Sequence, residues 1–470
     1  MKKQNNLTEG SVLKSLISLS VPIVLANILQ AAYQLTDTFW VGRLGAGAIA
    51  AVSISIPVIF LLISFGAGLT MAGSILTAQY KGKGDQEAIN HIAGQTLLMV
   101  FLVSVFLSVI GYFFSPYLIK FMGAEESVFL DAVSYLKISF MGIVFMFIYF
   151  VFQALMRGVG NVKVPMYIVL GTVLLNVVLD PLFIFGWGSI PAMGVAGAAL
   201  ATISTQGLSA LAGILILFIG KKDIYISINK LRFDFPLIKK MFLLGFPSSL
   251  EHSARSFGMI VMTFLVASFG TITMAAYGIG IRMLSLVVIP SVGLAIVTST
   301  LVGQNMGAGK IERAERVTKI SSLTGFFFLT LLGIFMFVFA KEISSVFIPG
   351  ETETIQSSTL FLRIMALTFG LIGVHHSISG AFRGAGDTFT AMMFSIILLW
   401  VFQFPLAYLL SKYTSLAEVG IWISFPAANI IITALIYFWF QKGFWRKKKI
   451  TEEIKVLEEV STEATIGGEL

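Results

Sequence analysis

The 470-residue sequence contains no cysteine, only four histidines and few charged residues, which make up 12% of the chain. Without cysteine, neither a disulfide framework nor a thiolate metal site is possible. The histidines form no sequence cluster with acidic residues, which argues against a metal centre. The sequence also lacks the Gly-x-Ser-x-Gly, His-Glu-x-x-His and paired catalytic aspartate motifs. An enzyme is therefore the weakest functional hypothesis, and no cofactor is expected.

The abundant residues are apolar: 57% of the chain is hydrophobic, and the mean hydropathy is +0.91. Such a composition is typical of a multi-pass membrane protein. A window of about 20 residues predicts roughly twelve spans. Lys2 and Lys3 precede the first apolar run, but that run is too long for a signal peptide, so it is predicted to be an uncleaved span. The approximate limits are 15–40, 47–78, 92–115, 131–155, 164–187, 194–219, 240–269, 273–303, 318–340, 358–381, 388–411 and 418–441.

Basic residues predict the orientation of these spans in the cell membrane. About 24 Lys and Arg residues outside the spans fall at the N-terminus, in the even-numbered loops and in the C-terminal tail, against about five on the opposite side. Both termini are therefore predicted to be cytoplasmic. The basic run 446–449 is interpreted as an anchor at anionic lipid headgroups and not as a nucleic-acid contact, and the chain is expected to be a monomer.

The chain is an internal duplication with an offset close to half its length. Residues 77–84 resemble residues 302–309, residues 154–161 resemble residues 381–387, and Pro22 corresponds to Pro247. An offset of six spans preserves orientation, so the halves are expected to be parallel repeats. The predicted fold is an all-α integral membrane protein of about twelve transmembrane helices in two pseudo-symmetric six-helix lobes. The predicted divisions are an N-terminal lobe at 1–222, a cytoplasmic linker at 223–239, a C-terminal lobe at 240–449 and a cytoplasmic tail at 450–470.

This arrangement favours a secondary transporter. Two six-helix lobes that meet at a central cleft can rock and expose the cleft to one side of the membrane and then to the other. A channel more usually has a repeated filter sequence, and none is visible.

The first predicted span contains a polar stripe. Gln30, Tyr33, Gln34 and Asp37 occur at positions i, i+3, i+4 and i+7, so they share one helix face. A carboxylate at membrane depth is a candidate functional group, because it is costly there unless it faces water or a partner. The alternative is an interfacial acid that reaches toward the headgroups, or a carboxyl group hydrogen-bonded for packing.

Further polar groups lie in the fifth and sixth predicted spans. Asn176 and Asp180 share a helix face at i, i+4, and Thr202 adds a hydroxyl. Two carboxylates in one cavity could share a proton or form an oxygen cage for a monovalent cation such as Na⁺, and the residues do not choose between these uses. The alternatives are a helix-end acid for Asp180 and a packing threonine for Thr202. Met262 occupies the position of Asp37 in the second repeat, so these acids are confined to the first.

The second repeat has its own ionisable and soft side chains. Glu251 and Arg255 lie at i, i+4 in the seventh predicted span and could form a structural bridge, with Arg282 as a second possible partner. The pair His375 and His376 could titrate near neutral pH or could be packed neutral imidazoles. Methionines offer adaptable apolar surface for lipophilic guests, or they face lipid; those assigned to a substrate cavity are Met259 and Met262.

Several motifs together resemble the multidrug and toxic compound extrusion family, and within it the DinF-like branch. The resemblance covers about residues 10–445. It rests on Pro22 fifteen residues before Asp37, the Tyr33-x-x-x-Asp37-Thr38-x-x-Val41-Gly42 segment, Gln79, the twin Arg157-Gly158 and Arg383-Gly384 loops, and the run Gly194-Val195-Ala196-Gly197-Ala198-Ala199.

The resemblance implies twelve helices in two lobes and cation-coupled export of organic, often cationic, drug-like compounds. It also implies a coupling site for H⁺ or Na⁺ in the N-terminal lobe and a helix kink at Pro22. By resemblance the site residues are Asp37, Asn176, Asp180, Thr202 and Tyr33, and Na⁺ would bind at the first four. The candidate substrate-cavity residues are Gln30, Gln34, Met259, Met262, Glu251, Arg255, His375 and His376.

The chain departs from the NorM-like branch of this family, which carries acids in spans seven and ten. Glu251 lies four residues after Pro247, earlier than that branch's glutamate, and span ten offers histidines. A sodium site in the C-terminal lobe is therefore not expected. The alternative function is a lipid-linked precursor flippase of the same superfamily, whose cavity would need several cationic side chains for a pyrophosphate. Only Arg255 and Arg282 are available for that role.

Overall fold

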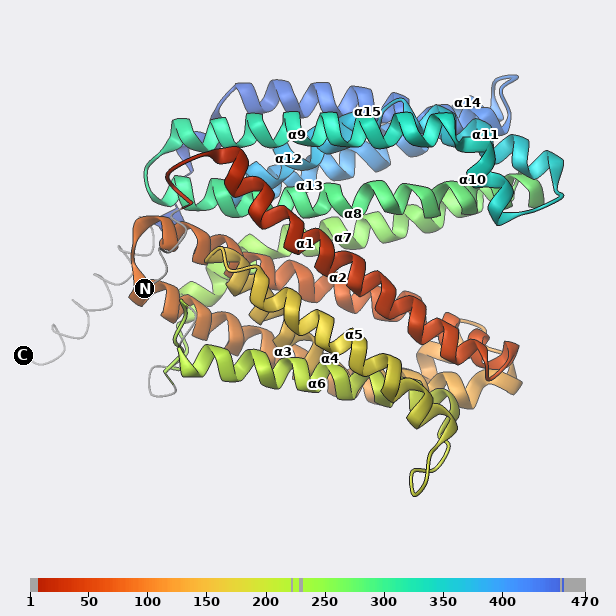
Figure 1. Ribbon diagram of the computed structural model, residues 1–470, viewed down its shortest axis with the longest axis horizontal. Helices are drawn as coiled ribbons and strands as arrows, with labels where there is room; N and C mark the ends of the chain where they lie inside the picture. The colour runs from red at the N-terminus through yellow and green to blue at the C-terminus, as the bar shows by residue number, and fades with distance from the viewer. Residues whose placement is uncertain (1–6, 221–222, 228–230, 449, 452–470) are drawn as a thin grey trace, which may run out of the picture. The chain divides into compact units, whose positions relative to one another are not determined.

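The computed structural model describes residues 7–220, 223–227, 231–448 and 450–451, and these residues fold almost entirely into helices (Figure 1). Their only β-pairing is an isolated bridge between Trp187 and Ile190. The helices are α1 (Val12–Gly42), α2 (Ala46–Lys83), α3 (Gln86–Phe121), α4 (Glu126–Gly158), α5 (Lys163–Phe185), α6 (Gly194–Ile219), α7 (Phe235–Ala267), α8 (Thr271–Gly307), α9 (Ile311–Val338), α10 (Ala340–Phe347), α11 (Thr352–Ala366), α12 (Phe369–Ala385), α13 (Thr388–Ile396), the π-helix η2 (Ile397–Gln403), α14 (Phe404–Lys412), α15 (Glu418–Gln441) and the 3₁₀-helix η3 (Phe444–Lys447).

The lengths and apolar character of these helices suit a membrane. Within the described residues, ten helical segments are long and apolar enough to cross a bilayer, and α11 with α12, bent by 49°, forms an eleventh. Helix α7 has 33 residues and would extend about 50 Å, but Glu251 and Arg255 make it less apolar. It occupies the position of the predicted span 240–269. The all-helical, multi-pass membrane fold predicted from composition is confirmed.

Three local features differ from the sequence-based expectation. The short helix α10 follows the ninth predicted span, where no helix was expected. The predicted span 388–411 is one helical segment, but its middle turns are the π-helix η2. The break between α11 and α12 occurs at residues 367–368, where there is no proline. There the Thr368 hydroxyl donates to the Met365 carbonyl at 3.3 Å, a local bond that competes with the helical pattern.

The chain divides into two compact units. Among the described residues, the N-terminal unit comprises residues 21–249, and the C-terminal unit comprises residues up to 20 and from 250 to 451. The borders fall inside α1 and α7, close to Pro22 and Pro247, where each proline removes a helical hydrogen bond. The lobe limits given above stay a prediction. Parts of them lie outside the described residues, namely 1–6, 221–222, the linker residues 228–230, 449 and the tail from 452.

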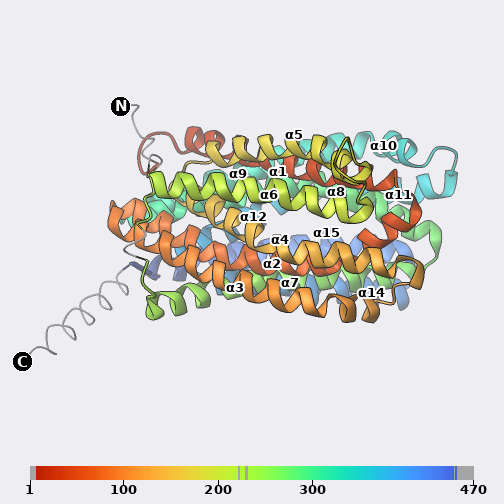
Figure 2. The same cartoon turned by 90° about the horizontal axis from the view of Figure 1, so that it is seen from below.

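The N-terminal unit is built around α4. This helix packs against α2, α3 and α6, and α5 packs against α6 (Figure 1, Figure 2). The side chains of Phe147, Phe152 and Leu155 on α4 are completely buried. Helix α5 carries Asn176 and Asp180 with no exposed surface, so packing fixes the position of both polar groups.

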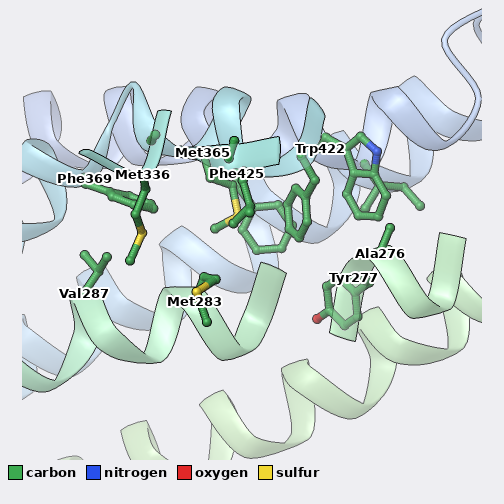
Figure 3. Packing of buried hydrophobic residues seen from close by; sticks show 14 of the residues in the cluster. Ala276, Tyr277, Met283, Val287, Met336, Met365, Phe369, Trp422 and Phe425 are labelled. Carbon is green, nitrogen blue, oxygen red and sulfur yellow. The ribbon is translucent and has the colours of Figure 1, made fainter. Parts of the chain in front are cut away.

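The C-terminal unit is built around α12, which packs against α8, α9 and α15. An aromatic core joins α8, α11 and α15. Phe361 stacks on Trp422 with ring centroids 4.1 Å apart, and the ring of Tyr277 is roughly parallel to both, with centroids 6.1 and 6.4 Å away. Figure 3 shows Tyr277 and Trp422 with neighbouring members of this core, including Met283 and Met365. The core includes residues of α7 and α12, the helices that carry the ionisable residues of this unit described below.

The duplication is visible in the backbone. Gly84 after α2 and Gly309 after α8 both adopt left-handed conformations, with φ of 81° and 71°. Gly160 after α4 and Gly386 after α12 do the same, with φ of 85° and 88°. This region favours glycine because it has no Cβ. The turns that the two repeats share in sequence therefore have the same conformation.

Candidate functional site

The N-terminal unit brings together the acidic residues predicted from its first and fifth spans. Asp37 lies on α1, and Asn176 and Asp180 lie one turn apart on α5, where the Asn176 amide donates to Asp180 Oδ1 at 2.8 Å. Asp180 has no exposed surface, whereas Asp37 is partly buried. The two carboxyl groups are close enough to interact electrostatically.

Three oxygens of this cluster have no partner. In the described part of the chain, Asp37 Oδ1, Asn176 Oδ1 and Asp180 Oδ2 are buried and accept no hydrogen bond. A buried polar atom without a partner is costly, and native structures contain few of them. All three atoms are acceptors, so a donor such as water, a proton or a small cation would satisfy them. The described residues contain no group of three His, Cys, Asp or Glu side chains suited to a multivalent metal.

Tyr33 connects α1 to α6 beside this cluster. Its hydroxyl lies 2.9 Å from Thr205 Oγ1, and the Thr205 hydroxyl donates to the Thr202 carbonyl at 2.9 Å, so Tyr33 is the donor. The predicted Thr202 is also close to Tyr33, and it lines a cavity of about 80 Å³ with Tyr135 and Gln206. Sequence analysis missed Thr205, which shares a helix face with Thr202 at i, i+3, a spacing that could have identified it.

The polar stripe on α1 is only partly gathered at this cluster. Tyr33 is buried, but the side chains of Gln30 and Gln34 are exposed. Pro22 is buried inside α1, which continues through it as one helix from Val12 to Gly42.

In the C-terminal unit, Glu251 on α7 is held mainly by Arg383 of α12. The Nη2 atom of Arg383 donates to both Glu251 oxygens at 2.6 and 2.8 Å, and the Ser395 hydroxyl donates to Oε1 at 2.8 Å. Arg255, the partner expected from the i, i+4 spacing, lies farther from Glu251 Oε1, at 3.6 Å. Arg282, the other candidate, is exposed on α8.

Sequence analysis missed Arg383 as the main partner of Glu251 because it was read only as part of a loop motif. A signal was present. Arg383 follows His376 by seven residues, or two helical turns, so it shares the face that carries the histidine.

A cavity of about 150 Å³ next to this ion pair collects most of the predicted substrate residues. It is lined by the charged pair Glu251 and Arg255 and is flanked by part of the π-helix η2. Gln30 and Gln34 lie on α1 and do not line it. The predicted residues that line this cavity are Glu251, Arg255, Met259, Met262, His375 and His376.

His375 is buried and His376 is partly buried, and both are incompletely bonded. His376 Nδ1 lies 3.0 Å from the Ile372 carbonyl, so this nitrogen donates. In the described residues, His376 Nε2 and His375 Nδ1 are buried without hydrogen-bond partners.

Comparison with known proteins agrees with this architecture. The profile of the MatE family matches residues 22–182 and 247–409, one segment in each repeat. The chain is 33% identical over 454 residues to a protein named probable multidrug resistance protein YoeA of Bacillus subtilis, with 95% of this chain and 97% of that protein covered. It is 29% identical over 454 residues to the probable multidrug resistance protein YpnP of the same organism, with 96% and 100% covered.

Solved structures give the same result. A crystal structure described as MATE in complex with MaL6 matches with a TM-score of 0.88 at 25% sequence identity, covering 94% of this chain and 98% of that one. The profile match spans most of the chain and both repeats. The chain therefore belongs to the MatE family, the multidrug and toxic compound extrusion transporters that its motifs resemble.

Proposed function

We propose that this membrane transporter exports amphipathic, often cationic, drug-like organic compounds from the cell in exchange for H⁺ or Na⁺. The ion would bind at Asp37, Asn176 and Asp180, next to Tyr33 and Thr202. The cell membrane is the expected location, with both termini in the cytoplasm, and the DinF-like branch is the expected subgroup. The names of its relatives in Bacillus subtilis support multidrug export. The observation that carries the coupling proposal is the group of three buried oxygens without partners.

The chemistry of this cluster suits a reversible cation. A proton on one carboxyl group turns it into a donor that can bond to a neighbouring oxygen, which satisfies two acceptors at once. A sodium ion entering as the transported cation would instead be coordinated directly by the oxygens. In both cases the cation removes repulsion between two carboxylates. Export is coupled to its entry if ion and drug prefer different conformers.

An asparagine substitution tests this role directly. Asp37→Asn keeps the size of the side chain but removes its negative charge, so we expect it to abolish drug resistance in an efflux-deficient host while membrane expression persists. The matched control is Asp131→Asn on α4, where the aspartate is exposed. Wild-type resistance in Asp37→Asn would rule out this residue as the coupling site.

The coupling ion is identified by transport in proteoliposomes. Proton and sodium gradients are imposed separately on the purified protein, and drug movement is followed. We expect at least one gradient to drive movement in the wild type and neither to do so in Asp37→Asn. Drug movement that neither gradient affects would contradict coupled exchange.

The second candidate is a lipid-linked precursor flippase. The observation that favours it is the second arginine beside Glu251, because pyrophosphate recognition requires cationic side chains. Arg383 is already engaged with Glu251, which weakens this candidate. Complementation of a flippase-deficient strain would establish it, and failure to complement with normal expression would exclude it.

A further inference from the structure

We propose that the cavity beside Glu251 in the C-terminal unit is a binding site for an amphipathic organic anion, with Arg255 as the group that holds the negative charge. This site goes beyond the proposed function. It concerns equilibrium binding in the C-terminal unit and holds whether or not Asp37 couples transport. Its ligand class is the opposite of the cationic compounds proposed above.

Among the described residues around the cavity, Arg255 has no acidic partner closer than the 3.6 Å contact with Glu251. Glu251 supplies one negative charge, and Arg255 and Arg383 supply two positive charges. Arg383 directs its short hydrogen bonds at both Glu251 oxygens, and the Ser395 hydroxyl also donates to one of them. The carboxylate is therefore neutralised and bonded without Arg255.

Arg255 remains available to a ligand. Its 3.6 Å approach to Glu251 is longer than the roughly 2.7–2.9 Å of a charge-assisted hydrogen bond. Its side chain is 35% exposed and lines the cavity, whereas Arg383 is only 12% exposed. A guanidinium carries five N–H donors, so Arg255 can still grip a carboxylate, sulfonate or phosphate group.

The two histidines provide an independent indication of a ligand. His375 is 4% exposed, and both histidines line the cavity. Among the described residues, His375 Nδ1 and His376 Nε2 are buried atoms without a hydrogen-bond partner. Buried nitrogens of this kind are destabilising unless something bonds to them. A ligand with a second polar atom would bond to an imidazole while its anionic group contacts Arg255.

The remaining walls suit an apolar ring or chain. Met259 and Met262 supply flexible, polarizable surface, and Trp400 supplies an aromatic face. Figure 3 shows three further lining residues, Tyr277, Met365 and Phe425, among the side chains of the adjoining core. The volume of about 150 Å³ is below that of a typical drug pocket, so it suits the anionic end of a small ligand and an adjoining ring system of the size of naphthalene.

The π-helix η2 also lines the cavity. Trp400 in η2 stacks on Phe257 of α7 at 5.5 Å and donates through Nε1 to the Ala254 carbonyl at 3.3 Å. These contacts fix the widened helical segment against the helix that carries Arg255. Single π-helical turns are rare and often occur at functional sites.

Equilibrium binding to the full-length protein in lipid nanodiscs tests the proposal without any ion gradient. The probes are three molecules with the same ring: 2-naphthoate, 2-naphthamide and 2-naphthylmethylammonium. We expect the wild type to bind the carboxylate at least about tenfold more tightly than the amide, the usual size of a charge-assisted hydrogen bond, and to bind the cation most weakly.

Substitutions assign the preference to Arg255. We expect Arg255→Gln to bind naphthoate and naphthamide equally, and Arg255→Lys to keep the order of the probes with lower affinity. Arg282→Gln, which removes an exposed arginine outside the cavity, should behave as the wild type. If Arg255→Gln does not fold, the lysine variant and the wild-type ranking still decide. Equal binding of the three probes by the wild type, or an unchanged preference in Arg255→Gln, would overturn the proposal.

Discussion

The ion pair between Arg383 and Glu251 allows a prediction whose size follows from burial. Glu251 is 2% exposed and Arg383 12% exposed, so substitution of Arg383 leaves a buried carboxylate without its closest positive partner. Breaking a buried pair in this way costs about 3–5 kcal/mol. The Ser395 hydroxyl remains as a donor, and Arg255 at 3.6 Å supplies partial compensation. We therefore expect Arg383→Gln to cost about 3 kcal/mol, at the lower end of that range.

The protein contains a matched control for this experiment. Arg446 donates to Glu315 at 2.7 Å, a distance similar to that of the buried pair, but both side chains are about 40% exposed. Exposed pairs contribute about 0.2–1 kcal/mol, so Arg446→Gln should have a small effect. The assay is thermal unfolding of each purified variant in the same detergent, followed by fluorescence.

The double variant Glu251→Gln, Arg383→Gln separates charge from packing. It leaves neither charge unpaired, so it should be more stable than Arg383→Gln alone. Equal losses of melting temperature in Arg383→Gln and Arg446→Gln would refute the argument from burial. A double variant less stable than Arg383→Gln alone would do the same.

Three further predictions concern packing and the N-terminal cluster. Gly373→Ala should lower the melting temperature, because a Cβ there would lie 2.7 Å from the backbone of α9, and overpacking costs about 1–3 kcal/mol. The control is Gly171→Ala, where a Cβ would have no neighbouring atom within 4 Å, so it should be neutral or stabilising. Tyr33→Phe should cost about 1 kcal/mol in thermal unfolding, because Thr205 keeps its own acceptor; a loss above about 3 kcal/mol would contradict this bonding scheme. If Na⁺ is the coupling ion, it should raise the melting temperature, and less so at lower pH, because a proton on either carboxyl group removes a ligand charge. Asn176→Leu should weaken the effect, and a Na⁺ effect independent of pH would contradict competition between the two ions.

Much of the fold was predictable because the hydropathy of the sequence indicates where the membrane-spanning helices lie. Each apolar run of about 20 residues has to form a helix that bonds its own backbone groups inside the bilayer. The duplicated motifs predicted the repeat, and in the structure they end in turns with left-handed glycines, such as Gly160 and Gly386. The break between α11 and α12 was not predictable in this way, because neither a loss of hydropathy nor a proline marks residues 367–368.

Contacts between candidate site residues were predictable where the two residues lie close together in the sequence. Asn176 and Asp180 lie one turn apart, and the hydrogen bond between them follows from helical spacing. The pairing of Glu251 with Arg383 joins residues 132 positions apart, and one sequence does not reveal such a contact. The same limit explains why Arg255, the local partner, was chosen. Helix spacing states which residues share a face, but the packing of neighbouring helices decides which of them meet.

The two proposed sites would give one scaffold opposite chemistry. In the first repeat, Asp37 and Asp180 have buried oxygens without hydrogen-bond partners among the described residues, and we propose that this cluster binds positive charge. In the second, Met262 takes the position of Asp37, and Glu251 is already paired with Arg383. The two repeats share turns and helix lengths, whereas a few differences between them, such as Asp37 against Met262, change which charged groups each proposed site contains. If both proposals hold, a cation would bind the first cluster and an anion would bind Arg255, so compounds of opposite charge would not compete for the same groups.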